Sequence, residues 1–222
     1  MKAVEILYFI VDDYEAMYGQ LISKKKEILT TSEIVRFDKY RLQKDQINFL
    51  LGRYLARKKN NLPNDDFLYN EFNKPYSLNC GDFNISHTDN MVAVVFSEQF
   101  DVGIDVEVLK PIQVDDLVNY FASFHEKEQI INKSGYSQLS EFYRIWTTKE
   151  AILKADGTGL IDRLPELSID EIINRNKSSY YGKIINNNWY LSCFVKAEAK
   201  EKIIFNVKEL GNSFFDLAGG CA

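Results

Sequence analysis

The segment Gly103-Ile104-Asp105-Val106-Glu107 alternates acids with small or apolar residues, and this alternation predicts a β-strand. Because successive strand side chains point to opposite faces, Asp105 and Glu107 are expected on one face, about 6.8 Å apart along the strand. Ile104 and Val106 are expected on the other face, in a hydrophobic core. Two neighbouring acids repel each other, so they indicate either a solvated edge or a hard cation such as Mg²⁺ between them.

A second informative stretch lies within Glu141 to Ala155, where the apolar spacing predicts a helix that Gly157 ends. Glu150 and Lys154 are four residues apart and therefore share one face of this helix. Such a pair is either a surface ion pair worth about 0.3 kcal/mol, or a carboxylate and an ammonium that act together on a charged ligand.

The remaining pattern predicts an α+β fold with mostly antiparallel strand pairing. Strands are expected at 3–11, 83–85, 91–96, 102–108, 167–169, 179–185, 189–195 and 203–207, and helices at 14–29, 36–60, 114–123, 125–132 and 141–155. Asn186-Asn187-Asn188 is expected to form a hairpin turn.

Composition excludes several classes of protein. The chain has 222 residues and a net charge of −5, which argues against a general nucleic-acid binder. It has no apolar run long enough for a membrane helix, and its three cysteines form no CxxC pair, so we expect a cytoplasmic protein. Basic residues gather between 24 and 59, and acids between 101 and 130. This separation suits a polyanionic ligand with a divalent cation, although it also fits a solvated helix followed by an acidic loop.

Two short motifs complete the candidate site. Asn84-Ile85-Ser86-His87 places a hydroxyl and an imidazole at a strand end, where both can donate to phosphate. A lone Ser-His pair can equally be structural. Asn73-Lys74-Pro75 predicts a turn, because the residue before a proline is pushed out of helical geometry.

Taken in order, these motifs resemble the Sfp-type 4′-phosphopantetheinyl transferases. The resemblance covers roughly residues 36 to 160. Its matching segments are Gly52-Arg53, Asn73-Lys74-Pro75, Asn84 to His87, Gly103 to Glu107 and Trp146 to Leu160. Asn73 stands where the family has glycine, and we expect the turn to survive because asparagine tolerates left-handed backbone geometry.

The resemblance implies Mg²⁺-dependent transfer of 4′-phosphopantetheine from coenzyme A to a serine hydroxyl of an acyl or peptidyl carrier protein, with release of 3′,5′-ADP. Mn²⁺ is a possible substitute for Mg²⁺. The implied metal ligands are Asp105, Glu107 and Glu150, and the implied catalytic residues are Asp105, Glu150 and Lys154. The implied coenzyme A contacts are Arg53, Lys74, Pro75, Ser86, His87, Lys149 and Lys154.

Within this set, Arg53 and His87 are expected at the 3′-phosphate and Lys154 at the pyrophosphate. The serine nucleophile needs a base. Glu150, or a metal-bound water that it polarises, is the first candidate, and Glu128 is the second.

The family also implies two similar α+β halves, a pseudo-dimer, with the active site in the cleft between them and a monomeric chain. We expect the N-terminal half at residues 1–110 and the C-terminal half at 111–222. An acidic carrier is expected to be steered by the basic region and held by apolar residues between Val114 and Ile131. The sequence does not specify the carrier pathway.

Two other functions fit part of the pattern. A non-catalytic coenzyme A or nucleotide binder would use the basic region alone and would not need three carboxylates. A Mg²⁺-dependent hydrolase of pyrophosphate bonds would use water as the nucleophile.

Overall fold

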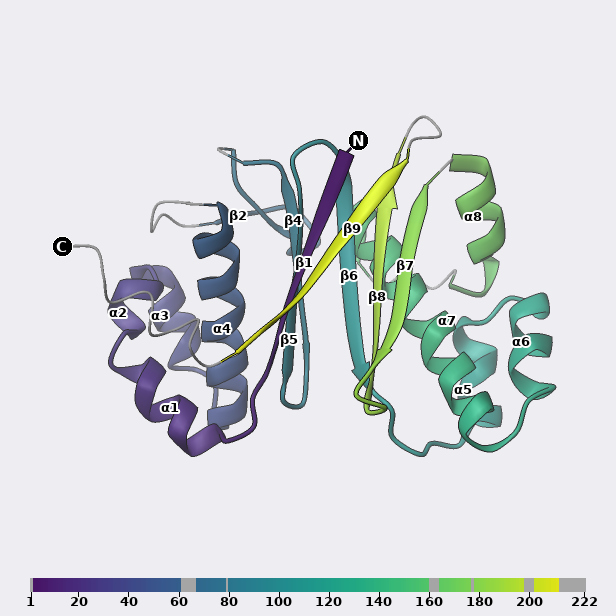
Figure 1. Ribbon diagram of the computed structural model, residues 1–222, viewed down its shortest axis with the longest axis horizontal. Coiled ribbons are helices and arrows are strands. Elements are labelled where there is room, and N and C mark those ends of the chain that lie inside the picture. The colour runs from purple at the N-terminus through teal and green to yellow at the C-terminus, as the bar shows by residue number, and fades with distance from the viewer. Residues whose placement is uncertain are drawn as a thin grey trace.

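The computed structural model describes residues 2–60, 67–78, 80–159, 164–176, 178–197 and 202–211, and it is an α+β fold (Figure 1). The first sheet has the strand order β4 (Asp82–Thr88), β5 (Met91–Ser97), β1 (Lys2–Ile10), β9 (Ile203–Leu210). The second has the order β6 (Asp101–Val108), β8 (Trp189–Lys196), β7 (Ser179–Ile185), and β2 (Leu68–Tyr69) pairs with β3 (Pro75–Tyr76). The β1–β9 pair is parallel and the other pairs are antiparallel, which confirms the expected fold class.

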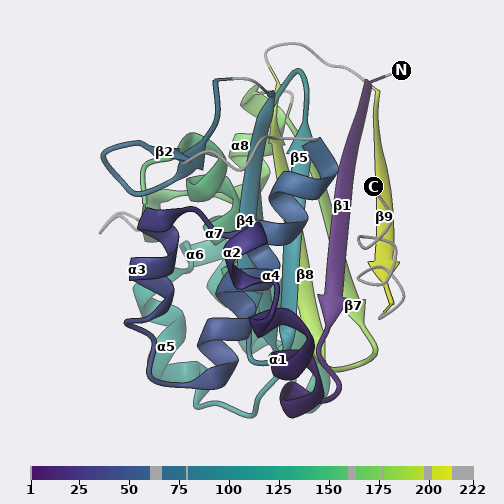
Figure 2. The same ribbon diagram turned by 90° about the vertical axis from the view of Figure 1, so that its left-hand side faces the viewer.

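Helices cover the outer faces of both sheets. On the first sheet lie α1 (Tyr14–Ile22), α2 (Lys25–Ile28), α3 (Thr31–Phe37) and α4 (Gln43–Asn60) (Figure 2). On the second lie α5 (Val114–Phe121), α6 (Phe124–Ile131), α7 (Gly135–Asp156) and α8 (Ile169–Asn176), and a 3₁₀ turn at Leu164–Glu166 precedes α8. No helix in these described ranges is long and apolar enough to cross a bilayer.

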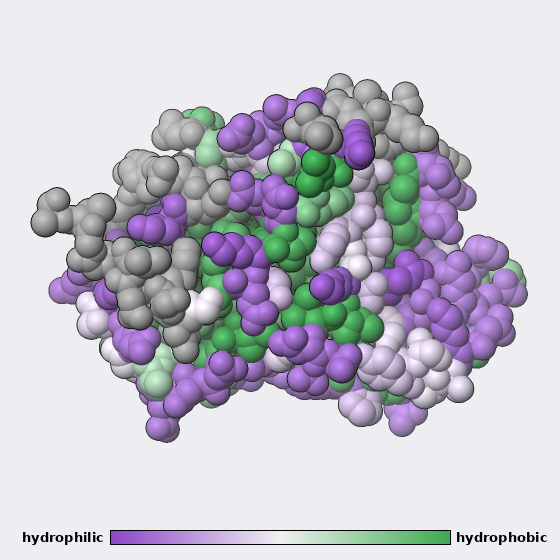
Figure 3. All heavy atoms as spheres, viewed as in Figure 1, coloured by the Kyte–Doolittle hydropathy of each residue, from purple (hydrophilic) through white to green (hydrophobic). Residues whose placement is uncertain are grey.

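The two sheets share an apolar core between their inner faces. Ile6 and Val95 of the first sheet belong to the same buried cluster as Ile104, Val106 and Leu191 of the second. This places Ile104 and Val106 in the core, as the strand alternation predicts. Figure 3 shows apolar side chains reaching the surface in the middle of the view, where the strands lie, with hydrophilic side chains around them.

The sheets are also joined at their neighbouring edge strands, β4 and β6, by side chains that bind main-chain groups. Oxygen atoms of Asp82, Asn84 and Ser86 accept hydrogen bonds from the main-chain N–H groups of Val102, Ile104 and Val106, at 2.8, 3.1 and 3.4 Å. Every second residue of β4 takes part because side chains alternate along a strand. We call this row of contacts the β4–β6 seam.

Helix α7 packs directly on β6 at Gly103. A methyl group at this position would overlap the carbonyl oxygen of Ala151 and the main-chain nitrogen of Ala155. Glycine in a strand often marks such a close approach of another backbone. Gly103 therefore sets the distance between the strand that carries Asp105 and the helix that carries Glu150 and Lys154.

Three local expectations are wrong. The predicted helix at 14–29 is divided into α1 and α2 by a turn at Ser23 and Lys24. The predicted strand at 167–169 is instead the approach to α8, because Ile169, Ile172 and Ile173 recur at helical spacing and pack on the core under α7. The predicted helix at 36–60 is divided into α3 and α4. Thr30 and Glu33 form a capping box that starts α3 earlier than expected.

The strand pairing does not follow the position of residue 110 along the chain. Strand β6 precedes residue 110 but pairs with β8, and β9 follows residue 110 but pairs with β1. Each large sheet thus takes a strand from the other side of this point. The division into halves at 1–110 and 111–222, and their pseudo-dimer relation, stay predictions.

We expect Gly103→Ala to lower the free energy of unfolding by about 3 kcal/mol or more, because the added methyl group must push α7 away from β6. Urea unfolding measures this change. Gly19→Ala is the matched control, since no atom lies within 4 Å of a methyl group there. Removing this exposed helical glycine should raise stability by about 0.5 kcal/mol. Equal effects of the two substitutions would contradict the close packing of α7 on β6.

Candidate active site

An ion pair between β6 and α7 forms the centre of the site. Lys154 Nζ lies 2.6 Å from Asp105 Oδ1, and Ser86 Oγ donates to the same oxygen at 2.9 Å. Lys154 Nζ also lies 3.2 Å from Ser86 Oγ. Asp105 is buried, whereas the Lys154 side chain keeps 29% of its surface exposed. Three segments that are far apart in sequence therefore meet at one carboxylate.

The other two predicted acids lie within electrostatic reach of Asp105. Burial raises the pKa of Glu150, and the negative charge of Asp105 raises it further, while Lys154 opposes both effects. Burial and Asp105 likewise raise the pKa of Glu107, whose Oε2 accepts a hydrogen bond from Thr88 Oγ1 at 3.1 Å. The charge of Asp105 therefore acts on both of the other carboxylates that the sequence analysis singled out.

The oxygen atoms of these acids suit a hard cation. Asp105 Oδ2 and Glu150 Oε1 are buried and accept no hydrogen bond from the described residues. Buried carboxylate oxygens normally have a partner, so these two are candidates for an ion. Within the described part of the chain, no three His, Cys, Asp or Glu side chains lie close enough together to hold a metal ion by themselves.

A cleft of about 240 Å³ opens beside this group of acids. One wall is the turn between β2 and β3, with Lys74 and Pro75. The opposite wall is the C-terminal part of α7, with Glu150 and Lys154. Asn73 has a φ of 63°, which confirms the expected left-handed turn. A larger hollow of about 540 Å³ lies beyond Asp82, and none of the predicted site residues lines it.

Arg53 and His87 lie on the α4 side of the site. Arg53 is buried, with Nε 2.9 Å from Glu33 Oε1, and its NH2 group donates to the Tyr69 hydroxyl at 2.9 Å. The side chain of His87 is exposed to solvent. Desolvation lowers the pKa of His87, and the positive charges of Lys154 and Arg53 lower it further. Two cationic groups therefore act on the space around His87.

Lys149 does not face the cleft, contrary to the expected coenzyme A contact. Its side chain is fully buried, and Nζ lies 2.6 Å from Glu126 Oε2. The same ammonium donates to the carbonyl oxygens of Phe121 and Leu164 at 2.7 and 2.9 Å. Because adjacent helical residues are about 100° apart around the axis, Lys149 and Glu150 point in different directions. Lys149 is thus a buried structural residue of the C-terminal part.

Glu128, the second candidate base, lies on α6 and is exposed. Its Oε2 is 3.7 Å from Nδ1 of the exposed His125. It does not line the cleft beside α7. Leu160, the last residue of the matching helical motif, falls outside the described residues.

The sequence analysis missed three residues that support the site: Asn70, Asp82 and Thr88. Asp82 is part of the β4–β6 seam, and Thr88 on the same strand donates a hydrogen bond to Glu107. The signal for both was the polar alternation at every second position from 82 to 88. Asn70 holds the β2–β3 turn through its side chain, and no local motif marked it.

One acid, Glu150, and two lysines, Lys74 and Lys154, line the cleft of this α+β fold, which is typical of an enzyme that handles a polyanionic substrate. Residues 101–206 match the model of the 4′-phosphopantetheinyl transferase superfamily. The chain belongs to this family, as the resemblance implied, and is a 4′-phosphopantetheinyl transferase.

Individual relatives agree with this assignment. The chain is 32% identical over 200 residues to the 4′-phosphopantetheinyl transferase gsp of Aneurinibacillus migulanus, covering 81% of this chain and 83% of that protein. It is 30% identical over 185 residues to a putative 4′-phosphopantetheinyl transferase of Synechocystis, covering 78% and 74%. It is 32% identical over 135 residues to Sfp of Bacillus subtilis, covering 57% and 59%.

The two lysines of the α7 motif should respond differently to substitution by methionine. Lys149→Met leaves Glu126 as an unpaired buried charge, so we expect a loss of about 3–5 kcal/mol in the free energy of unfolding. Lys154→Met also leaves a buried acid, Asp105, without its ion-pair partner, but water reaches the partly exposed position of Lys154, so we expect a smaller loss of about 1–3 kcal/mol. This variant should nevertheless abolish transfer. Urea unfolding and a transfer assay on both variants measure these effects. A larger loss of stability in Lys154→Met than in Lys149→Met would contradict the assignment of Lys149 as the buried structural lysine.

Proposed function

We propose that this chain transfers 4′-phosphopantetheine from coenzyme A to a serine hydroxyl of an acyl or peptidyl carrier protein and releases 3′,5′-ADP. The observation that carries the proposal is the meeting of Asp105, Glu150 and Lys154 beside a cleft whose other wall is the Lys74–Pro75 turn. The ammonium of Lys154 and the neighbouring carboxylate oxygens suit the pyrophosphate of the donor and a cation that it binds.

Asp105, Glu107 and Glu150 would hold Mg²⁺, or Mn²⁺ in its place. The unpartnered oxygens Asp105 Oδ2 and Glu150 Oε1 support this assignment. When bound, the ion offsets negative charge on the pyrophosphate. Lys154 supplies a further positive charge on the same side, and Ser86 and Asp105 orient its ammonium.

In the transfer step, the serine oxygen forms a bond to the phosphorus that carries the pantetheine arm. The bond from that phosphorus to the bridging oxygen breaks, and 3′,5′-ADP leaves with the bonding electrons. The serine proton passes to a base. We propose Glu150, or a metal-bound water that it polarises, as this base because its carboxylate borders the cleft. The exposed Glu128 is the alternative.

The 3′-phosphate of coenzyme A would bind near Arg53 and His87. The supporting observation is that the positive charges of Lys154 and Arg53 act at His87, where the negative charges of Asp45 and Asp105 oppose them. Pro75 and Ser86 would border the nucleotide, while Lys149 takes no direct part because its ammonium is buried elsewhere.

The carrier protein would dock on an apolar patch of α5 and α6. The patch consists of Leu117, Tyr120, Phe124 and Ile131, which are 43, 76, 79 and 44% exposed. Large apolar side chains with this exposure favour a protein partner. The basic region would steer an acidic carrier, and its exposed Lys58 lies on α4, whereas the side chain of Lys59 is outside the described residues.

We propose a monomer, since one chain supplies all three acids. We place this monomer in the cytoplasm.

The direct test is the intact mass of an apo-carrier protein incubated with this protein, coenzyme A and Mg²⁺. We expect a gain of one phosphopantetheine, and Glu150→Gln should slow this gain at least about a hundredfold. Near-normal turnover of the variant at saturating Mg²⁺ would contradict Glu150 as the base. Release of 3′,5′-ADP without a carrier would indicate a hydrolase, and binding without release would indicate a non-catalytic binder.

The docking patch makes a separate prediction. Phe124→Ser and Tyr120→Ser should each raise the KM for the carrier about tenfold and leave the KM for coenzyme A unchanged, because each removes exposed apolar contact area. Leu78→Ser is the control, since Leu78 is 80% exposed but lies in the N-terminal part of the chain. If the control raised the carrier KM as much as the patch variants, this docking surface would be wrong.

A further inference from the structure

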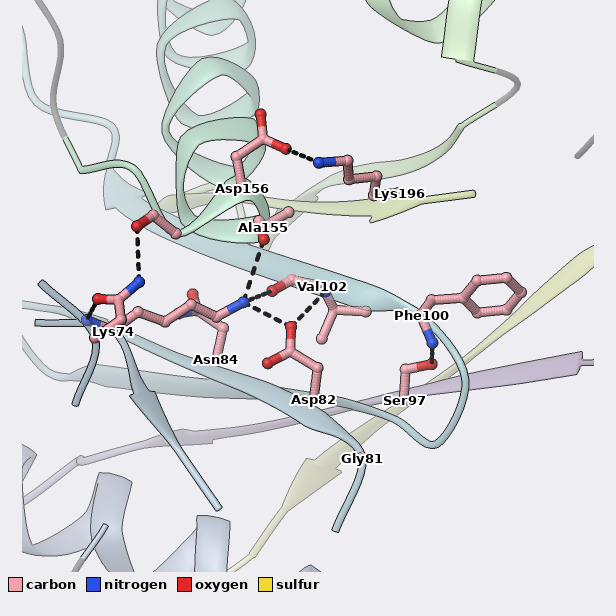
Figure 4. Close-up of polar contacts among 12 residues, drawn as sticks. Lys74, Gly81, Asp82, Asn84, Ser97, Phe100, Val102, Ala155, Asp156 and Lys196 are labelled. Atoms are coloured by element: carbon pink, nitrogen blue, oxygen red, sulfur yellow. Dashed lines mark hydrogen bonds and ion pairs between the residues drawn. The ribbon is translucent and has the colours of Figure 1, made fainter. Parts of the chain in front are cut away.

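The ammonium of Lys74 binds three groups of the protein. Its Nζ donates to Asp82 Oδ2 at 2.6 Å, to the carbonyl oxygen of Val102 at 3.2 Å and to that of Ala155 at 3.3 Å (Figure 4). A lysine ammonium has three protons, so these contacts use its full donor capacity. The charge of Lys74 is therefore directed at the protein and not at a phosphate of a bound nucleotide.

These three contacts join three elements. Asp82 begins β4, Val102 belongs to β6, and Ala155 lies in the last turn of α7. Carbonyl oxygens in the last turn of a helix lack intrahelical partners and carry partial negative charge, so they favour a cation. Asp82 Oδ2 also accepts the main-chain N–H of Val102 at 2.8 Å. Figure 4 shows the Lys74 side chain extending to this meeting point of the two strands and the helix.

Asn70 ties the same turn to the same helix end. Its Nδ2 donates to the carbonyl oxygen of Gly157 at 2.8 Å, while its Oδ1 accepts the main-chain N–H groups of Phe72 and Lys74 at 3.0 and 2.8 Å. Gly157 has a φ of 65° and caps α7. The two walls of the 240 Å³ cleft are thus bound to each other at one end.

We propose that Lys74, Asp82 and Asn70 are positioning residues that hold the β2–β3 turn against the C-terminal end of α7, and so fix the width of the coenzyme A cleft. This inference rests on the proposed function of the cleft. Asp82 does not line the cleft, so it acts through Lys74. A preorganised cleft binds its ligand more tightly because it needs no ordering on binding.

The test measures the binding of coenzyme A and of 3′-dephospho-coenzyme A by calorimetry, without a carrier protein. We expect Asp82→Asn to weaken both ligands about tenfold, because a loosened wall no longer fits the nucleotide. Lys74→Met should weaken both by the same factor, and the double variant should bind no worse than either single one. At saturating coenzyme A, kcat of Asp82→Asn should stay within about twofold of the wild type, whereas its KM rises.

Two variants complete the design. Asn70→Ala removes the second connection and leaves the side-chain contact between Lys74 and Asp82 in place, and it should also weaken both ligands. If Asp82→Asn does not fold, Asn70→Ala decides the question. Asp101→Asn is the matched control, since Asp101 is an exposed acid at the start of β6, and it should bind both ligands as the wild type does.

Three results would overturn the inference. Unchanged binding by Asp82→Asn and Asn70→Ala would show that these hydrogen bonds do not fix the width of the cleft. A larger loss for coenzyme A than for the dephospho form in Lys74→Met would make Lys74 a phosphate ligand. Additive losses in the double variant would show that Lys74 and Asp82 act separately. A wild-type protein that binds neither ligand would instead contradict the proposed function.

Discussion

The site depends on the close packing of helix α7 on strand β6 at Gly103. Only a residue without a side chain allows the Ala151 carbonyl to approach this strand. The approach brings Lys154 within 2.6 Å of Asp105, although 49 residues separate them along the chain. It also places Glu150 where the charge of Asp105 raises its pKa. The geometry of the acids therefore follows from one backbone contact.

The β4–β6 seam also fixes the position of β6, on which α7 packs. Asn84 and Ser86 bind main-chain N–H groups of β6, and Ser86 and Thr88 also hold the carboxylates of Asp105 and Glu107. The same polar row thus joins the sheets and orients the acids. Neighbouring carboxylates repel each other, and the ion pair of Lys154 with Asp105 offsets part of this repulsion. The site is built from segments on both sides of residue 110, so it requires the whole fold.

Much of the site was predictable because its residues follow strict local periods. The alternation in β6 placed Asp105 and Glu107 on one face, and the four-residue spacing in α7 placed Glu150 with Lys154. The same spacing could not separate Lys149 from the site, because its burial depends on Glu126 and on carbonyl groups far along the chain. The helix that begins at Ile169 was missed because Leu167-Ser168-Ile169 alternates as a short strand does, and so short a run does not distinguish a strand from a helix. Lys74 was placed at the turn, but its three partners come from long-range packing.

The most direct test of the central claim measures how Mg²⁺ changes the affinity for coenzyme A. Acids from β6 and α7 that share one ion should make Mg²⁺ tighten this binding at least about tenfold in the wild type, which is about 1.4 kcal/mol. The effect should fall below about twofold in both Asp105→Ala and Glu150→Ala, and it should remain in Glu128→Ala, whose acid lies outside the cleft. A full Mg²⁺ effect in Glu150→Ala would contradict the account, because the helix would then contribute no ligand to the ion.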